Sequence, residues 1–162
     1  MRTAAPRAGL VIGAFLLASC QAPAPQFTAQ DEATLRAMFD SVAAEVTSSR
    51  WDTWAGHYAA DAYLQPPNAP TVRGRAAILA WGQAFPSVES LVFSDAQVAG
   101  EGNMAYGSTA YALKLKDLPM DTGKQLVVFR RAPGGAWEVH AVSFNSDLPL
   151  PAPAPATGSP GH

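Results

Sequence analysis

The hydrophobic periodicity of this chain changes once, at Pro86, and that change limits the fold more than any other feature. Before Pro86, apolar residues recur three and four positions apart, as they do on one face of a helix. After Pro86 they alternate with polar residues, and β-branched and aromatic side chains become frequent, as in strands. Helices followed by hairpin-linked strands indicate an α+β domain, in which an antiparallel-rich sheet carries the helices on one face.

The helical part divides into three predicted helices. Thr28 and Asp31 resemble a capping box ahead of the first, whose apolar face is Leu35, Met38, Phe39, Val42 and Val46. The second is predicted to hold Trp51, Trp54 and Tyr58. Further along the chain, Pro66 and Pro67 occupy positions that can be neither a helix interior nor a central strand. The third follows Gly74, is stopped by Pro86, and contains Ile78, Leu79, Trp81, Gly82 and Phe85.

Four strands are predicted after Pro86, over residues 91–99, 104–115, 126–131 and 137–145. Turns at 100–103 and 132–135 join two pairs of them, and the second strand is long enough to bend at Gly107. A bent sheet with helices across its mouth encloses a cone. We expect a ligand pocket inside that cone.

The N-terminus has the pattern of an export signal. Two arginines, Arg2 and Arg7, precede an apolar run over residues 8–18 that is too short to span a bilayer comfortably. The run ends in Leu17-Ala18-Ser19-Cys20, which resembles the lipobox of bacterial lipoproteins. The resemblance implies a signal peptide over residues 1–19 and a lipid-carrying Cys20 that attaches the protein to a membrane.

The remaining boundaries follow from composition. Residues 20–26 form a short Pro/Ala tether, and residues 148–162 are rich in proline and small residues and are predicted to be disordered. The folded domain is therefore predicted over residues 27–147. Gln21 follows the cysteine where lipoproteins retained in an inner membrane more often carry Asp. By that resemblance we expect the protein to be anchored to the periplasmic face of an outer membrane.

Charge and cysteine content exclude several classes of protein. The formal net charge is −2 and there is no large basic patch, so a nucleic-acid partner is not expected. A single cysteine provides neither a disulfide framework nor a cysteine-based zinc site. The three histidines lack the spacing of metal ligands. No metal and no cofactor is predicted.

Several short motifs occur in a recognisable order between Thr28 and Asp147. They are Tyr58-Ala-Ala-Asp61-Ala62, Val72-Arg-Gly74-Arg75, Asp121-x-Gly123-Lys124, Gly135-x-Trp137 and Phe144-Asn145-Ser146-Asp147. Together they resemble the SnoaL-like (DUF4440) group of the NTF2-like superfamily. The resemblance implies a cone-shaped domain that commonly forms a homodimer through its sheet. It does not specify function, because the superfamily includes isomerases, cyclases, dehydratases, transport factors and binding domains.

Ketosteroid isomerase is the relative with the clearest mechanism, which uses an Asp base with a Tyr and a protonated Asp as oxyanion donors. The resemblance places Pro66 at the position of the base and Val127 at that of the second acid, while the first helix has no tyrosine. Val142 stands where SnoaL-like proteins often carry another Asp. Isomerase chemistry of that kind is therefore not expected.

Three residues are weak candidates for a catalytic base: His57, Asp61 and His140. His57 and Asp61 would act as a pair; alternatively, Asp61 caps a turn and His57 lies on the surface. Strand alternation predicts that His140 shares one face with Val142 and Phe144, and that Val139, Ala141, Ser143 and Asn145 occupy the other.

Aromatic residues with a polar atom are the predicted pocket residues, because a buried tyrosine or tryptophan needs a partner for that atom. With one amide from the last strand, the set is Tyr58, Tyr63, Trp81, Tyr111 and Asn145.

Three functions remain open. The favoured one is a lipid-anchored envelope protein that binds a small apolar molecule without catalysis. The first alternative is an enzyme of the SnoaL or isomerase type with a His or Asp base. The second is a homodimeric interaction module of the envelope.

Overall fold

The computed structural model describes residues 25–149 and contains three helices and six strands. In chain order these are α1 (Ala29–Thr47), α2 (Trp51–Gly56), β1 (Tyr58–Gln65), β2 (Val72–Arg73), α3 (Arg75–Gln83), β3 (Val88–Glu101), β4 (Met104–Leu115), β5 (Met120–Arg131) and β6 (Trp137–Ser146). The predicted signal peptide, Cys20, and most of the predicted tether and tail lie outside the described residues. Within residues 25–149, no helix has both the length and the apolar character needed to cross a membrane.

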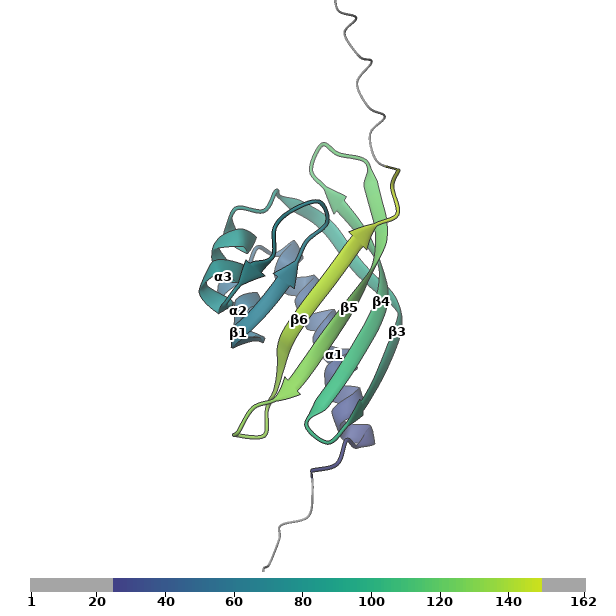
Figure 1. Cartoon of the computed structure of the whole chain (residues 1–162). Coiled ribbons are helices and arrows are strands. Elements are labelled where there is room, and N and C mark those ends of the chain that lie inside the picture. Colours follow the sequence, from purple (N-terminus) through teal and green to yellow (C-terminus); the bar gives the residue numbers. More distant parts are fainter. Residues whose placement is uncertain (1–24, 150–162) are drawn as a thin grey trace, which may run out of the picture.

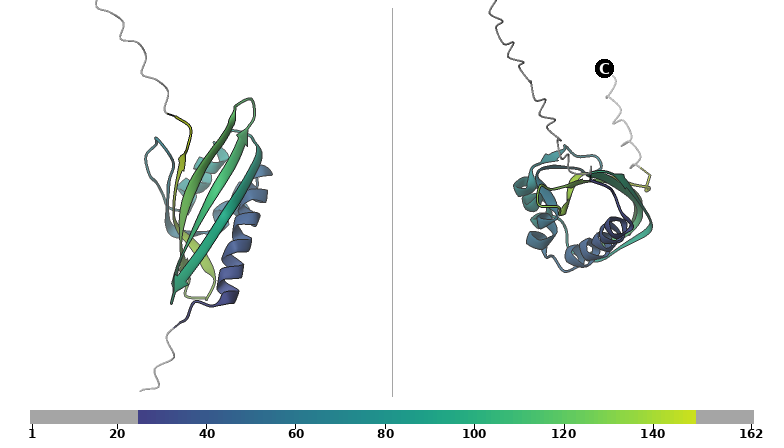
Figure 2. Two further views of the ribbon diagram at one scale, coloured as in Figure 1. Left: turned by 90° about the vertical axis from the view of Figure 1, so that its right-hand side faces the viewer. Right: turned by 90° about the horizontal axis from the view of Figure 1, so that it is seen from below.

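All six strands form one sheet in the order β2-β1-β6-β5-β4-β3. Every neighbouring pair is antiparallel except β1 and β6, which run parallel. The sheet curves around α1, while α2 and α3 lie together beside β1 (Figure 1; Figure 2, right). The predicted α+β class, with helices against a strongly curved and mostly antiparallel sheet, is confirmed.

Helix α1 begins at the predicted cap and buries the predicted face. The hydroxyl of Thr28 accepts a hydrogen bond from the Asp31 backbone N–H, and the Asp31 carboxylate accepts one from the Thr28 backbone N–H. Leu35 and Phe39 are buried against the concave face of the sheet. Phe39 packs over Gly107 of β4, where a Cβ atom would lie only 2.7 Å from its ring. The glycine therefore lets helix and sheet approach closely.

Several predicted boundaries are wrong. The third helix, α3, ends at Gln83, so that Phe85 lies outside it, and β3 runs from Val88 to Glu101 where a strand over 91–99 was predicted. Two further errors concern α2 and β5. The second helix was expected to include Tyr58, but α2 ends at Gly56 and Tyr58 opens β1. The strand expected over residues 126–131 begins six residues earlier, at Met120. In both places the boundary depends on strand pairing: β1 pairs with β6, which lies far along the chain, and the first part of β5 pairs with the end of β4 across a tight hairpin. Local propensity does not contain that information.

The Asp31 carboxylate connects the start of α1 to the turn end of the β5–β6 hairpin, where β5 ends and β6 begins. Asp31 accepts hydrogen bonds from Trp137 Nε1 at 2.8 Å and from Thr28, and its Oδ2 lies 2.9 Å from the Arg131 guanidinium. The Arg131 guanidinium also stacks over the Trp137 ring at 4.3 Å. Chiefly the hydrogen bond from Arg131, and then those from Trp137 and Thr28, hold the pKa of Asp31 far below its usual value.

We expect Asp31→Asn to lower the melting temperature at neutral pH by several degrees. A carboxyl whose pKa is lower in the folded chain stabilises the fold above its unfolded pKa of about 4, and that contribution disappears as the pH falls through the folded value. Between about pH 5 and about pH 2, the variant should therefore lose less stability than the wild type. Thermal melts across this range test the expectation. The control is Asp40→Asn, at an exposed position of the same helix. If the melting temperatures of all three proteins depended equally on pH, the expectation for Asp31 would be contradicted.

Candidate functional site

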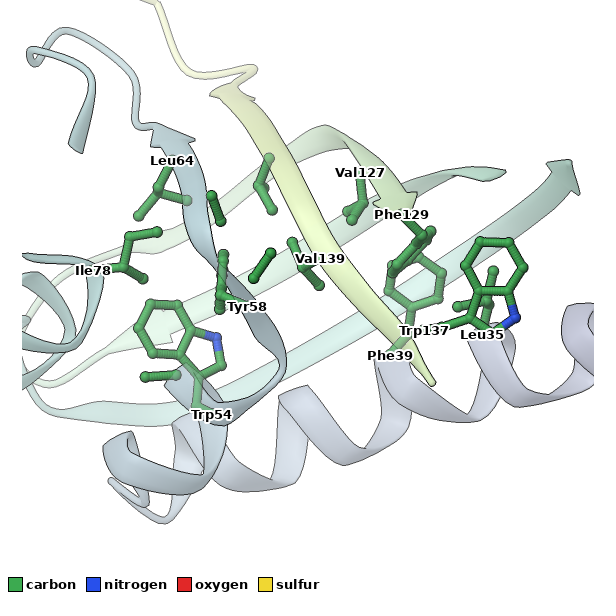
Figure 3. Close-up of a cluster of buried hydrophobic side chains, with 14 of the residues drawn as sticks. Leu35, Phe39, Trp54, Tyr58, Leu64, Ile78, Val127, Phe129, Trp137 and Val139 are labelled. Carbon is green, nitrogen blue, oxygen red and sulfur yellow. The ribbon is translucent and has the colours of Figure 1, made fainter. Parts of the chain in front are cut away.

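An apolar pocket occupies the inside of the cone. Its walls come from α1, α2 and α3 on one side and from the concave faces of β1 and β3 to β6 on the other. The cavity has a volume of about 120 Å³ and is open to solvent at its mouth. Figure 3 shows Trp54, Tyr58, Leu64 and Ile78 gathered at one end of the core, and Phe39, Phe129 and Leu35 at the other.

Aromatic rings in mutual contact, edge-on or tilted, form most of the helical wall. Trp54 lies 5.1 Å from Tyr58 and 5.6 Å from Trp51, measured between ring centroids. Trp81 lies 4.8 Å from Phe85 and 6.3 Å from Phe144 of β6. Such contacts between bulky rings fix the shape of the wall before any ligand enters.

The wall contains no carboxylate, imidazole, ammonium or guanidinium group among the residues that the structure describes. Its only ionisable side chains are two tyrosines, Tyr58 and Tyr111. Burial raises the pKa of Tyr58, and burial together with the nearby charge of Asp121 raises that of Tyr111. Both phenols are therefore neutral at physiological pH. The pocket presents an uncharged, mostly apolar surface.

Tyr111 is held in the wall from two sides. Its ring lies against Gly123, its partner on β5, where a Cβ atom would come within 2.4 Å of the ring and hydroxyl. Its hydroxyl donates a hydrogen bond to Asp121 at 3.3 Å, and that carboxylate also accepts one from Ser146 at 2.6 Å. The Tyr111 hydroxyl is thus already engaged by the protein.

The predicted pocket residues divide into two groups. Tyr58, Trp81 and Tyr111 line the pocket. Tyr63 and Asn145 do not, because alternation along β1 and β6 turns their side chains to the outer, convex face of the sheet. For those two residues, the predicted position in the pocket is corrected.

A bulge in β6 explains why simple alternation failed there. Val128 of β5 pairs with Ala141, but the next residue, Phe129, pairs with Val139, so His140 has no partner in the register. Val139 and Val142 consequently both face the pocket, although they were predicted to lie on opposite faces. His140 does not line the pocket, which contradicts its predicted grouping with Val142.

The three candidate bases, His57, Asp61 and His140, all lie outside the pocket wall. His57 and Asp61 do not contact one another as the predicted pair. His57 caps the end of α2, and its Nε2 lies 3.0 Å from Oε2 of buried Glu45, not beside Asp61. Asp61 forms an ion pair with Arg130 at 2.6 Å on the convex face. The hydrogen bond from Arg130 lowers the pKa of Asp61, which makes this carboxylate a weaker base.

His140 lies near the Asp61–Arg130 ion pair, on the convex side of the sheet. Its ring packs edge-on against Tyr63 at 5.9 Å, and its Nδ1 lies 4.0 Å from an Asp61 oxygen. Elsewhere in residues 25–149, no three acidic, histidine or cysteine side chains gather in a way that could hold a metal ion.

Sequence reasoning missed one polar residue of this site, Gln125, which lines the pocket on the inner face of β5. Its cross-strand partner on β4, Thr109, is buried beside it but does not line the pocket. Neither belongs to a motif, and only the pairing of β4 with β5 brings them together.

The fold and the sequence both assign the chain to a known family. The model of the SnoaL-like domain matches residues 35–145, which is more than half of the chain. The chain therefore belongs to the SnoaL-like domain family, whose members share this cone. No curated protein matches the chain significantly.

Solved structures confirm the NTF2-like fold at low sequence identity. An NTF2-like protein with a cystatin-like fold from Novosphingobium aromaticivorans is 17% identical, with a TM-score of 0.63 over 71% of this chain and 80% of that one. A protein of unknown function from Nostoc punctiforme is 16% identical, with a TM-score of 0.68 over 78% and 98%. A ketosteroid isomerase-like protein from Erwinia carotovora atroseptica is 13% identical, with a TM-score of 0.63 over 75% and 100%. At these identities the likeness concerns the fold alone.

Proposed function

We propose that this protein binds a small apolar molecule in its cone and does not chemically change it. The composition of the wall carries this proposal: apart from Gln125, the pocket is lined by aromatic and aliphatic side chains, and no group that could exchange a proton near neutral pH stands among the described lining residues. His57, Asp61 and His140 instead make contacts outside it. An enzyme of the isomerase type needs a base that reaches the bound substrate.

Filling the pocket with a larger side chain should weaken binding strongly. Val127 lines the pocket on β5, so Val127→Phe fills space that a ligand would occupy. The neighbouring Leu126 points to the convex face and is 49% exposed, so Leu126→Phe adds a similar volume outside the pocket. We expect indane, a compact hydrocarbon probe, to bind the purified wild-type protein and Leu126→Phe, and to lose at least about tenfold in affinity for Val127→Phe.

Titration calorimetry measures this affinity, and thermal melts verify that each variant is folded. Equal affinity of all three proteins for indane would show that binding occurs elsewhere. No binding to the wild-type protein would contradict the proposal.

We also propose that the protein is exported and attached by Cys20 to the cell envelope, with the outer membrane favoured. The support is the run of residues 8–18 and the lipobox-like Leu17-Ala18-Ser19-Cys20, which lie outside the described residues. The assignment to the DUF4440 group within the SnoaL-like proteins stays a prediction. Incorporation of labelled palmitate into the full chain, lost in Cys20→Ser, tests the anchor.

A second candidate function is the homodimeric interaction module. Tyr106 and Leu126 are both 49% exposed and are diagonal neighbours on the convex faces of β4 and β5. Val92 of β3 is exposed on the same face. An apolar sheet face of this kind favours contact with another protein surface. Light scattering of the purified protein distinguishes a dimer, which supports this function, from a monomer, which contradicts it.

A further inference from the structure

The first described residues of the chain are packed against one end of the cone, beside two strand turns. Phe27 contacts Trp137 at the start of β6 edge-on, with 5.8 Å between the ring centroids. It also covers Gly100 near the end of β3, where a Cβ atom would lie 2.7 Å from the Phe27 ring. The β3–β4 turn (residues 102–103) and the β5–β6 turn (residues 132–136) lie at this same end (Figure 1). We call it the tether end, because the N-terminal segment leaves the domain there.

The pocket opens at the opposite end of the cone. Several lining side chains remain partly exposed to solvent there: Val42, Leu91, Leu113 and Phe144. They belong to the second half of α1, the start of β3 and the ends of β4 and β6, which antiparallel pairing brings together away from the tether end. At the tether end, in contrast, buried Leu35 and Trp137 fill the cone (Figure 3). We call the opposite end, from which the β4–β5 turn (residues 116–119) projects, the mouth end (Figure 1).

The length of chain between Cys20 and the domain limits how the cone can be oriented on a membrane. Only residues 21–24 separate Cys20 from Pro25, the first described residue. Since an extended chain spans about 3.5 Å per residue, the segment from Cys20 to Pro25 reaches no further than about 18 Å. Strand β4 runs from the tether end to the mouth end, and its 12 residues at about 3.3 Å each make it about 40 Å long. A lipid on Cys20 therefore holds the tether end near the bilayer, and the cone is too long to turn its mouth toward that surface.

The charge of the domain favours an upright position over one in which a flank lies on the membrane. Residues 25–149 contain nine basic and thirteen acidic side chains, a net charge of −4 with histidine neutral. An anionic phospholipid surface repels a domain of this charge, so its flanks are not drawn down. The β5–β6 turn at the tether end consists of alanine, proline and glycine and has no charged side chain. It can therefore approach the headgroups closely.

We propose that the tether end faces the phospholipid surface to which Cys20 attaches the protein, and that the pocket opens on the opposite, aqueous side. The inference rests on the proposed anchor and the proposed binding function, and it specifies the source of the ligand. An apolar molecule enters from the aqueous compartment, not from the bilayer that holds the protein. The size of the cavity agrees with this source, since about 120 Å³ is too small for a two-chain phospholipid.

Energy transfer from two labelled positions of the full lipidated chain tests this orientation. The vesicles consist of phosphatidylethanolamine and phosphatidylglycerol and contain a lipid with an acceptor dye on its headgroup. Gly134→Cys places a thiol in the β5–β6 turn, where a Cβ atom would have no neighbour within 4 Å, and Leu118→Cys places one in the β4–β5 turn, where Leu118 is 50% exposed. Because the Cys20 thiol carries the lipid, a maleimide fluorophore reacts with the introduced cysteine alone. We expect the label at position 134 to lose most of its fluorescence to the acceptor and the label at position 118 to lose little. Thermal melts verify that both variants are folded.

Flotation with the vesicles separates failure of the anchor from failure of the orientation. The wild-type chain should float with the vesicles, and Cys20→Ser should not. If the wild-type chain does not float, the proposed anchor fails and the orientation fails with it. If the chain floats but both labels lose fluorescence equally, or the label at position 118 loses more, the orientation is overturned and the anchor stands. The binding of indane by the purified protein is decided independently of either result.

Discussion

Replacing Gly123 with alanine is expected to lower the melting temperature by roughly 10 °C or more. An alanine Cβ at this position would lie 2.1 Å from the backbone oxygen of Asn145 and 2.4 Å from the Tyr111 ring. The first of these neighbours is backbone within the β5–β6 pairing, so it cannot move aside without breaking the sheet. Overpacking of this kind costs about 3 kcal/mol or more in the free energy of unfolding, which corresponds to that shift for a domain of this size.

Gly134→Ala is the matched control for this prediction. Gly134 lies in the β5–β6 turn, and a Cβ atom there would have no neighbour within 4 Å. Calorimetric melts of both variants should therefore show a large shift for Gly123 and almost none for Gly134. Similar melting temperatures in the two variants would refute the packing argument. A folded Gly123 variant should also bind indane more weakly, since displacement of Tyr111 changes the pocket wall.

The sequence was sufficient for those elements in which local pattern and tertiary role agree. Helix α1 has a capping box and an apolar face at helical spacing, and both are present in the structure. Strand β4 was predicted with its observed bounds, Met104–Leu115, since alternation continues along it without interruption. Where the hydrophobic period, the turn residues and the packing all favour the same structure, one sequence predicts the element.

Prediction failed where long-range pairing determines the structure. Tyr58 lies at helical spacing from Trp54, yet it begins a strand because β6 pairs alongside it. The bulge at His140 reverses the faces that alternation assigns to the first half of β6. The candidate site was affected most, since one bulge decides which side chains enter the pocket. Thr109 and Gln125 become a pair only through the register of β4 and β5.

His57→Ala is expected to destabilise the fold by about 3 kcal/mol, although His57 was predicted as a possible catalytic base. Its imidazole lies 3.0 Å from the Glu45 carboxylate, whose side chain is only 7% exposed. The His57 side chain itself is 24% exposed, so its removal leaves the more deeply buried Glu45 carboxylate without its hydrogen bond. Denaturant unfolding measures the loss. Glu32→Ala is the control: Glu32 and Arg36 form a pair at 2.9 Å with both side chains about 40% exposed. That variant should lose only about 0.5 kcal/mol.

The double variant of Glu45 and His57 separates a structural role from a loss of packing alone. If the unpaired Glu45 carboxylate causes the instability of His57→Ala, removing that carboxylate as well should relieve part of it. The double variant, Glu45→Ala with His57→Ala, should then lose less free energy of unfolding than the two single variants lose together. Additive losses would instead mean that the two residues act independently. Binding of indane below the melting temperature should be unchanged in His57→Ala, because neither residue lines the pocket. A base that acts on a bound molecule has to reach it, and in this fold the imidazole is turned toward Glu45.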